Sequence, residues 1–173
     1  DLRDDIFGEG LALVGDQFVQ LTWTDGIRIL YDAETLDPVG TQPYKDEGWG
    51  MCYDGENIYT SNGSTEITER DPETFAVIAK REVTLQGQPI NQINELECVG
   101  DVIYANVWYT ENILRIDKVT GVVTGLVDAS GMLTPEQRAQ ITYSGATMNG
   151  IAFDETDDTF LLTGKLWPWL FRV

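Results

Sequence analysis

An internal repeat constrains the fold of this chain more than any other feature of the sequence. Residues 8–36, 48–75 and 94–121 can be laid over one another, and residues 149–173 form a shorter fourth copy. In the first three copies an apolar strand leads through a Gly/Asp turn to a second strand, and a polar turn leads to a third strand ending in Asp-x-x-Thr. These endings run from Asp32 to Thr35, from Asp71 to Thr74 and from Asp117 to Thr120. Four-stranded repeats spaced by about 45 residues are typical of β-propeller blades, whose first strands lie nearest the central axis.

Short β-forming runs between Gly/Asp turns fill almost the whole chain, for example at residues 17–21 and 102–106. The sequence therefore predicts an all-β fold with a single β-propeller domain over residues 1–173. The blade-like repeats are expected near residues 8–46, 47–90, 91–133 and 148–173. A sandwich built from hairpins is the alternative.

One segment departs from the strand pattern. Thr134 followed by Pro135 is typical of a helix N-terminus, since Thr caps the first turn and Pro is favoured at the first helical position. We expect a short helix near residues 134–142, inserted between the third and fourth repeats.

Size and charge limit the possible partners. A chain of 173 residues with 42% apolar content can bury the core of one domain. No apolar run approaches the roughly 18 residues that a membrane span requires, so we expect no membrane partner. The net charge of -18 repels nucleic acid and anionic lipid, which excludes nucleic acid as an expected partner. A neutral or cationic ligand fits this charge better.

Metal and thiol chemistry have little support in the sequence. There is no histidine, and Cys52 and Cys98 do not form a Cys-x-x-Cys pair, so we expect no metal site of the usual zinc type and no cofactor. Both cysteines lie in apolar stretches without a nearby basic residue, which favours a buried structural role over a reactive thiolate. Whether they form a disulfide depends on a distance that the sequence does not give.

Blade geometry predicts where a functional site lies. Because neighbouring strands alternate in direction, the start of each first strand and the turn between the second and third strands lie on one face of the propeller. The first-strand starts carry Glu9, Trp49, Asn94 and Asn149. The turns carry Trp23, Trp108 and Lys165, and Asn62-Gly63-Ser64 in the second copy. We expect a carboxylate, two carboxamides, three indoles and an ammonium group at one end of the central channel.

Several of these residues also have a structural interpretation. Tryptophan often packs between propeller blades, and we interpret Trp167 and Trp169 in this way. Asn149 precedes Gly150 and can serve as a turn cap. Lys165 can be a solvated surface lysine. Glu9, by contrast, lies between two glycines, where the missing side chains leave room for a ligand.

Four stretches of the sequence resemble one known family over essentially the whole chain. They read FGEGLAL, DEGWGM, INELECVGDVIYANVWYTENILRID and MNGIAFDETDDTFLLTGKLWP. They are similar to plant and bacterial glutaminyl-peptide cyclotransferases, also called glutaminyl cyclases. The resemblance implies a five-bladed β-propeller that converts the N-terminal glutamine of a peptide or protein to pyroglutamate and releases ammonia without zinc. It also implies an extracytoplasmic location, periplasmic or secreted.

The resemblance assigns roles to individual residues. Glu9, Asn94 and Lys165 match the catalytic positions of the family, and Trp23, Trp49 and Trp108 match its substrate pocket. Asn149 joins the expected substrate-binding set through the repeat argument alone.

One family motif is missing, and two other functions stay open. The Phe-Thr-Gln-Gly-Leu motif of the family's first blade does not occur here. We therefore expect about three and a half to four blades, completed by an N-terminal segment outside this sequence or by association, since exposed strand edges are a liability. A non-catalytic propeller could bind a peptide N-terminus or a small cation in the same aromatic cup. A propeller hydrolase or lactonase would use Glu9, Asn94 and Asn149 to hold a metal.

Overall fold

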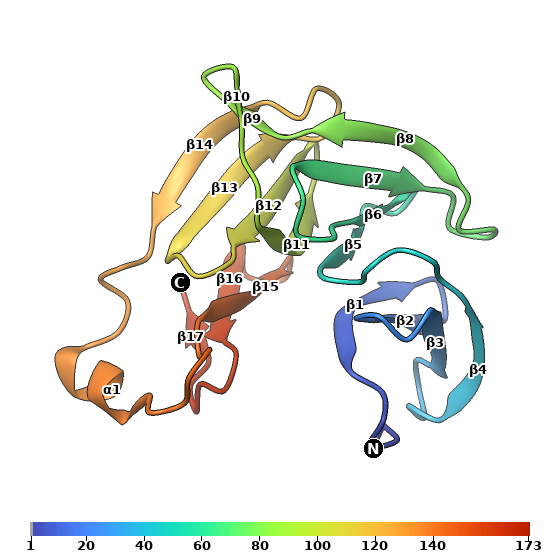
Figure 1. The fold of residues 1–173 in the computed structure, drawn as a ribbon, viewed down its shortest axis with the longest axis horizontal. Helices are drawn as coiled ribbons and strands as arrows, with labels where there is room; N and C mark the ends of the chain where they lie inside the picture. The colour runs from blue at the N-terminus through green and yellow to red at the C-terminus, as the bar shows by residue number, and fades with distance from the viewer. Residues whose placement is uncertain (1) are drawn as a thin grey trace.

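A computed structural model describes residues 2–173 and shows three four-stranded sheets, one three-stranded sheet and a small hairpin (Figure 1). The first sheet contains β1 (Gly8–Val14), β2 (Gln17–Thr22), β3 (Ile27–Asp32) and β4 (Pro38–Pro43). The second contains β5 (Met51–Tyr53), β6 (Ile58–Thr60), β7 (Glu66–Arg70) and β8 (Val77–Glu82). The third contains β11 (Ile93–Val99), β12 (Val102–Val107), β13 (Asn112–Asp117) and β14 (Val123–Asp128). The fourth contains β15 (Met148–Asp154), β16 (Thr159–Gly164) and β17 (Phe171–Arg172), and the hairpin is β9 (Thr84–Leu85) with β10 (Gln88–Pro89).

Each sheet is an antiparallel meander whose strand order follows the chain. The first strands contact one another in sequence, β1 with β5, β5 with β11, and β11 with β15. Figure 1 shows these four strands toward the middle of the molecule and β4, β8 and β14 at its periphery. The predicted all-β propeller is therefore confirmed, with four blades of which the fourth has three strands.

The Asp-x-x-Thr endings explain why the outer turns of the first three blades are alike. In each, the Asp carboxylate accepts a hydrogen bond from the backbone N–H of the Thr, at 2.7 to 2.8 Å. The residue after the Thr has a left-handed backbone, with φ of 61° at Leu36, 62° at Phe75 and 75° at Gly121. The short polar side chain thus closes the turn before the fourth strand begins.

The hydrophobic core lies between neighbouring blades. Leu21 and Met51 belong to the cluster between the first and second blades, Ile67 and Leu96 to that between the second and third. A third cluster joins the third and fourth blades through Ile113, Met148, Ile151 and Leu162. Burying each such side chain contributes about 1.5–3 kcal/mol, so the inter-blade contacts fix the inner strands that carry the site.

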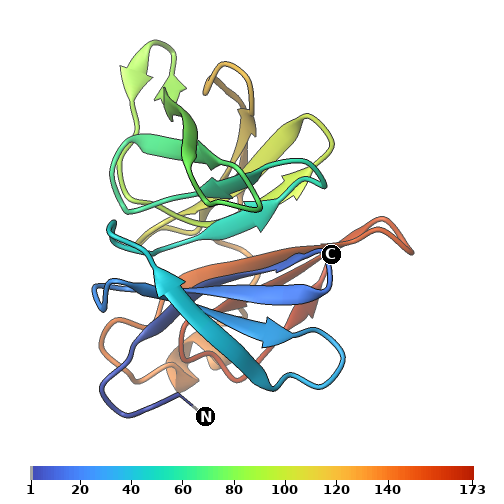
Figure 2. The same cartoon turned by 90° about the vertical axis from the view of Figure 1, so that its right-hand side faces the viewer.

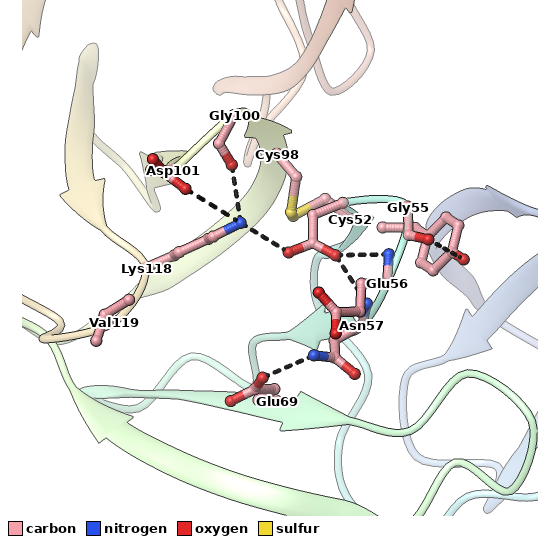
Figure 3. A network of polar contacts seen from close by, with 12 residues as sticks. Cys52, Gly55, Glu56, Asn57, Glu69, Cys98, Gly100, Asp101, Lys118 and Val119 are labelled. Carbon is pink, nitrogen blue, oxygen red and sulfur yellow. Dashed lines mark hydrogen bonds and ion pairs between the residues drawn. A yellow bond between two sulfur atoms is a disulfide. The ribbon is translucent and has the colours of Figure 1, made fainter.

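The two cysteines form a disulfide between β5 and β11 (Figure 3). Cys52 is 3% exposed, which agrees with the predicted structural role. Close to the disulfide, Lys118 Nζ lies 3.0 Å from the Asp54 carboxylate and donates to the Gly100 carbonyl oxygen at 3.0 Å. Lys118 and Gly100 belong to the third blade, and Asp54 belongs to the turn that follows β5. The bond to Asp54 therefore joins the second and third blades at the end opposite the strand starts.

The inserted helix α1 (Pro135–Gln140) begins after Thr134, as the sequence indicates. The Thr134 hydroxyl accepts from the Gln137 N–H, and the Gln137 side chain accepts from the Thr134 N–H, which completes a capping box. The insertion leads into β15, whose turn to β16 projects from the side opposite the starts of the first strands (Figure 2). Among residues 2–173, no helix has the length and apolar character needed to cross a membrane.

Candidate active site

A cavity of about 360 Å³ lies where the starts of the inner strands meet the turns between second and third strands. Its walls contain six of the seven residues that the sequence predicts for the site. The complete lining is Phe7, Glu9, Trp23, Trp49, Asn94, Trp108, Tyr109 and Lys165. Side chains from all four blades therefore converge on one pocket.

A β-bulge at the start of the first strand positions the polar side chains. The strand register shifts at the same place in β1, β11 and β15: between Gly8 and Leu11, between Ile93 and Leu96, and between Met148 and Ile151. A bulge adds a residue and redirects the side chains next to it. Glu9, Asn94 and Asn149 occupy these bulges.

Hydrogen bonds between blades hold the bulges in place. The Gly50 N–H donates to Ser61 Oγ at 2.8 Å, and the Ser61 hydroxyl donates to the Asn94 carbonyl oxygen at 2.7 Å. A Cβ atom on Gly50 would overlap that same carbonyl group, so only glycine fits there. The Gly10 N–H donates to the Trp49 carbonyl oxygen at 2.8 Å and joins the first blade to the second.

Asn149 does not line the pocket, which departs from its predicted place in the substrate-binding set. Its Oδ1 accepts from the backbone N–H of Glu95 at 3.3 Å. In the reverse direction, the Gly150 N–H donates to Asn106 Oδ1 at 3.0 Å. The carboxamide of Asn149 thus has a backbone partner in the bulge that contains Asn94, and its geometry is that of a positioning residue.

The aromatic walls include two edge-to-face pairs, and Tyr109 packs on Trp108 in a tilted arrangement. Trp49 and Trp108 have ring centroids 6.1 Å apart, and Phe7 and Trp23 have centroids 6.3 Å apart. The Trp49 indole lies over Gly63, where a Cβ atom would come within 2.6 Å of the ring. This contact explains why the second blade has no large side chain in that turn, since Trp49 occupies the space.

Charge in the pocket comes from Lys165 and Glu9. The Lys165 ammonium lies 4.5 Å from the ring centroid of Phe7 and 5.4 Å from that of Trp108. Its backbone N–H donates to the Thr147 carbonyl oxygen at 2.8 Å, which fixes the turn. Burial raises the pKa of the Glu9 carboxyl, and the positive charge of Lys165 opposes that rise. Glu9 is thereby suited to exchange a proton closer to neutral pH than a surface glutamate would.

Asn94 presents an acceptor without a partner. The residue is 4% exposed, and Oδ1 has no hydrogen-bond partner among residues 2–173. A buried polar atom left unpaired costs about 1–3 kcal/mol, and such atoms in a pocket are suited to bind a ligand. Asn94 Oδ1 can accept a hydrogen bond from an N–H group placed in the cavity.

Sequence reasoning missed two residues that line the pocket and one carboxyl near it. Phe7 and Tyr109 line the pocket and adjoin predicted turn or strand-start positions, so the repeat register contained a signal for both. Glu95 follows Asn94, and burial raises its pKa well above the ordinary value, with the Glu9 and Glu97 carboxylates adding to the rise. Burial and the two neighbouring carboxylates thus all favour the protonated form of Glu95.

The hydrolase alternative requires Glu9, Asn94 and Asn149 to share one metal. Asn149 lies outside the pocket lining and bonds to the Glu95 backbone, so the three donors do not line one cavity. Within residues 2–173, no group of three or more His, Cys, Asp or Glu side chains is placed to hold a metal ion.

Comparisons with known proteins agree with this fold. A sequence profile of the glutamine cyclotransferase family matches residues 1–173. A glutaminyl-peptide cyclotransferase from Arabidopsis thaliana is 33% identical over 174 residues, covering 96% of this chain and 52% of the relative. The chain thus spans about half the length of that relative. The crystal structure of Myxococcus xanthus glutaminyl cyclase matches with a TM-score of 0.92 and 43% identity, over 98% of this chain and 72% of the other. A computationally designed protein, Ika8, matches with a TM-score of 0.50 and 13% identity, over 94% of this chain and 44% of the other, and bears on the fold alone.

Proposed function

The chain belongs to the glutamine cyclotransferase family, and on that premise we propose that it forms the catalytic pocket of a glutaminyl-peptide cyclotransferase. The substrate is a peptide or protein with an N-terminal glutamine, which is converted to pyroglutamate with release of ammonia. One observation carries the proposal. A raised-pKa carboxyl, an ammonium group and an unpaired carboxamide oxygen line a single aromatic cavity.

The reaction is an intramolecular substitution. The α-amino nitrogen attacks the carbon of the side-chain carboxamide, a new C–N bond forms, and the bond to the amide nitrogen breaks. Glu9 accepts the proton that the α-ammonium group must lose before attack. After attack the same nitrogen loses a second proton, which passes through Glu9 to the departing nitrogen. That nitrogen leaves as ammonia, and the first proton is released to solvent. A carboxyl with a raised pKa is matched to both transfers.

Asn94 and Lys165 stabilise the polar groups of the reacting side chain. Asn94 Oδ1 accepts from a substrate N–H, which supplies its missing partner. Lys165 faces the negative charge that develops on the carboxamide oxygen during attack. Removing one such stabilising donor from an enzyme typically lowers kcat by about 10²–10³-fold.

The aromatic walls fold the substrate. Trp23, Trp49 and Trp108 enclose the glutamine side chain and bring its amine and carboxamide ends together. Holding reacting groups in contact removes much of the entropic barrier to ring closure. The ring faces also favour the cationic amine.

Two wider proposals follow from the same family membership. A segment outside these 173 residues completes the propeller, which is supported by the shares of 52% and 72% that the chain covers in its relatives. The protein acts in an extracytoplasmic compartment, periplasmic or secreted. The Cys52–Cys98 disulfide supports this location, since disulfides persist in oxidising environments.

Ammonia release from a Gln-initiated peptide tests the proposed function. The full-length protein should release one ammonia per peptide, and mass spectrometry should show the matching loss from the product. The same peptide with an acetylated N-terminus should not react, because its nitrogen cannot attack. A propeller that only binds peptide N-termini would leave the masses of both peptides unchanged.

A further inference from the structure

A second cavity, of about 440 Å³, adjoins the pocket and has no role in the reaction described above. The two cavities share one wall residue, Tyr109. A peptide whose N-terminal glutamine fills the first cavity must continue away from it, and the second cavity lies next along the wall.

The same two turns build both cavities. The turn after β12 directs Trp108 to the first cavity and Glu111 to the second, and the turn after β16 directs Lys165 to the first and Trp167 to the second. A left-handed residue lies within each turn, Tyr109 with φ of 61° and Leu166 with φ of 62°. These backbone reversals separate the side chains that face each cavity.

The inserted segment closes the second cavity. Leu133, Arg138 and Ala146 line it, and Arg138 lies on α1. The Arg138 guanidinium donates to the Glu111 carboxylate at 2.7 Å and to the Ser130 carbonyl oxygen at 3.1 Å. This pair ties α1 to the turn after β12, so the insertion forms a wall of the cavity.

Trp167, one of the residues that line the second cavity, carries an unpaired donor. Trp167 Nε1 is buried and has no hydrogen-bond partner within the described residues 2–173. Its indole packs on Gly164, where a Cβ atom would overlap the ring. The side chain is therefore held in place while its N–H group lacks an acceptor. A main-chain carbonyl of a bound peptide would supply one.

We propose that the second cavity binds the residues that follow the N-terminal glutamine of the substrate, with Trp167 Nε1 donating to a peptide carbonyl. This inference rests on the proposed function, which assigns a binding site to the N-terminal glutamine and none to the residues after it. Leu133, Ala146 and Met148 supply apolar lining beside the polar groups of Thr110, Glu111 and Arg138.

Trp167→Phe tests the proposal directly, because it removes the donor and keeps an aromatic ring. No hydrogen bond within residues 2–173 is lost, since Nε1 has none there. In the full-length protein, kcat/KM for Gln-Leu-Ala amide should fall about fivefold, the effect of one neutral hydrogen bond. Turnover of glutamine amide, which lacks following residues, should stay unchanged. Trp169→Phe, a matched variant of a tryptophan outside both cavity linings, should change neither substrate.

A second variant tests the cavity by filling it. Ala146→Phe should lower kcat/KM for Gln-Leu-Ala amide more than for glutamine amide. The inference is overturned if, in both Trp167→Phe and Ala146→Phe, kcat/KM falls equally for the two substrates. It is also overturned if kcat/KM falls for neither substrate in both variants. If the wild-type protein cyclises neither substrate, the proposed function itself fails. Turnover of both substrates by wild type separates the two outcomes.

Discussion

At the scale of single residues, two opposing effects set the pKa of Glu9 in the pocket. Burial raises the pKa of Glu9, and Lys165 limits that rise. Nearby, burial raises the pKa of Glu95 well above its ordinary value. Among the described residues that line the pocket, Glu9 is the only carboxyl, so it is the group placed to exchange the proton with the substrate.

Replacement of Lys165 by Gln should move the pH profile as well as lower the rate. Glu9 must be ionised to accept a proton, so kcat/KM rises with pH through the Glu9 pKa. Lys165 lowers that pKa, and its removal should shift the acidic limb to higher pH. The profile of kcat/KM from pH 5 to 9 measures this shift, and Lys45→Gln, an exposed lysine outside the pocket, serves as the control. An acidic limb that stays in place would contradict the assigned coupling.

Glu97 predicts a pH dependence of stability. Burial raises its pKa to about 7, opposed by the Phe153 N–H and aided by Glu155. A carboxyl with a pKa raised on folding binds protons more tightly in the folded state, so its contribution to stability is lost as pH rises from the unfolded pKa through about 7. Glu97→Gln should raise the thermal midpoint at pH 8 by at least about 2 °C and change little at pH 5. If Glu97→Gln is less stable than wild type by the same amount at both pH values, the ionised Glu97 carboxylate does not destabilise the folded protein.

At the scale of elements, the bulged starts of the inner strands form a linked series. Ser61 connects Gly50 to the Asn94 backbone, and Asn149 and Asn106 connect the third and fourth blades in both directions. Because the bonds of Ser61 to Asn94, Asn149 to Glu95 and Gly150 to Asn106 cross between blades, the pocket residues are positioned by neighbouring blades as well as by their own strands.

Gly63→Ala tests the fit of Trp49 against the second blade. Gly63 has φ of 77°, and a Cβ atom there would meet the Trp49 indole. Gly87 has the same φ, with no atom within 4 Å of an added Cβ. Both alanine variants should lose about 1–2 kcal/mol of stability from the left-handed backbone. Only Gly63→Ala should also lower kcat/KM, and equal activity of the two variants would place Trp49 outside the substrate pocket.

The sequence predicted the repeats, the inserted helix and six of the pocket residues, because each follows from a local pattern. The Asp-x-x-Thr endings mark turns that recur, and Thr134-Pro135 marks a helix start. It did not predict the parts that depend on packing between blades. Nothing in the sequence near Ser61 or Asn106 indicates that they bond to a distant bulge. The sequence around Asn149 is equally compatible with a pocket residue and with a turn cap.

At the scale of the whole molecule, the pocket and the disulfide lie at opposite ends of the inner strands. Cys52 and Cys98 are separated by 46 residues in sequence, and crosslinking a loop of that length stabilises the fold by about 4 kcal/mol in the chain-entropy model. The double variant Cys52→Ser with Cys98→Ser should therefore lower the free energy of unfolding in urea by up to about 4 kcal/mol. While folded, it should retain most of its activity. A folded double variant without activity would mean that the crosslink also positions the pocket.

The central claim is that Glu9 moves the proton in glutamine cyclisation, and one comparison tests it most directly. Ammonia release from a Gln-initiated peptide is measured for wild type and Glu9→Gln in the full-length protein, with circular dichroism on both samples to establish that they are folded. The account predicts steady release by wild type and a loss of at least about a hundredfold in the variant. Near-equal release by a folded Glu9→Gln protein would contradict it.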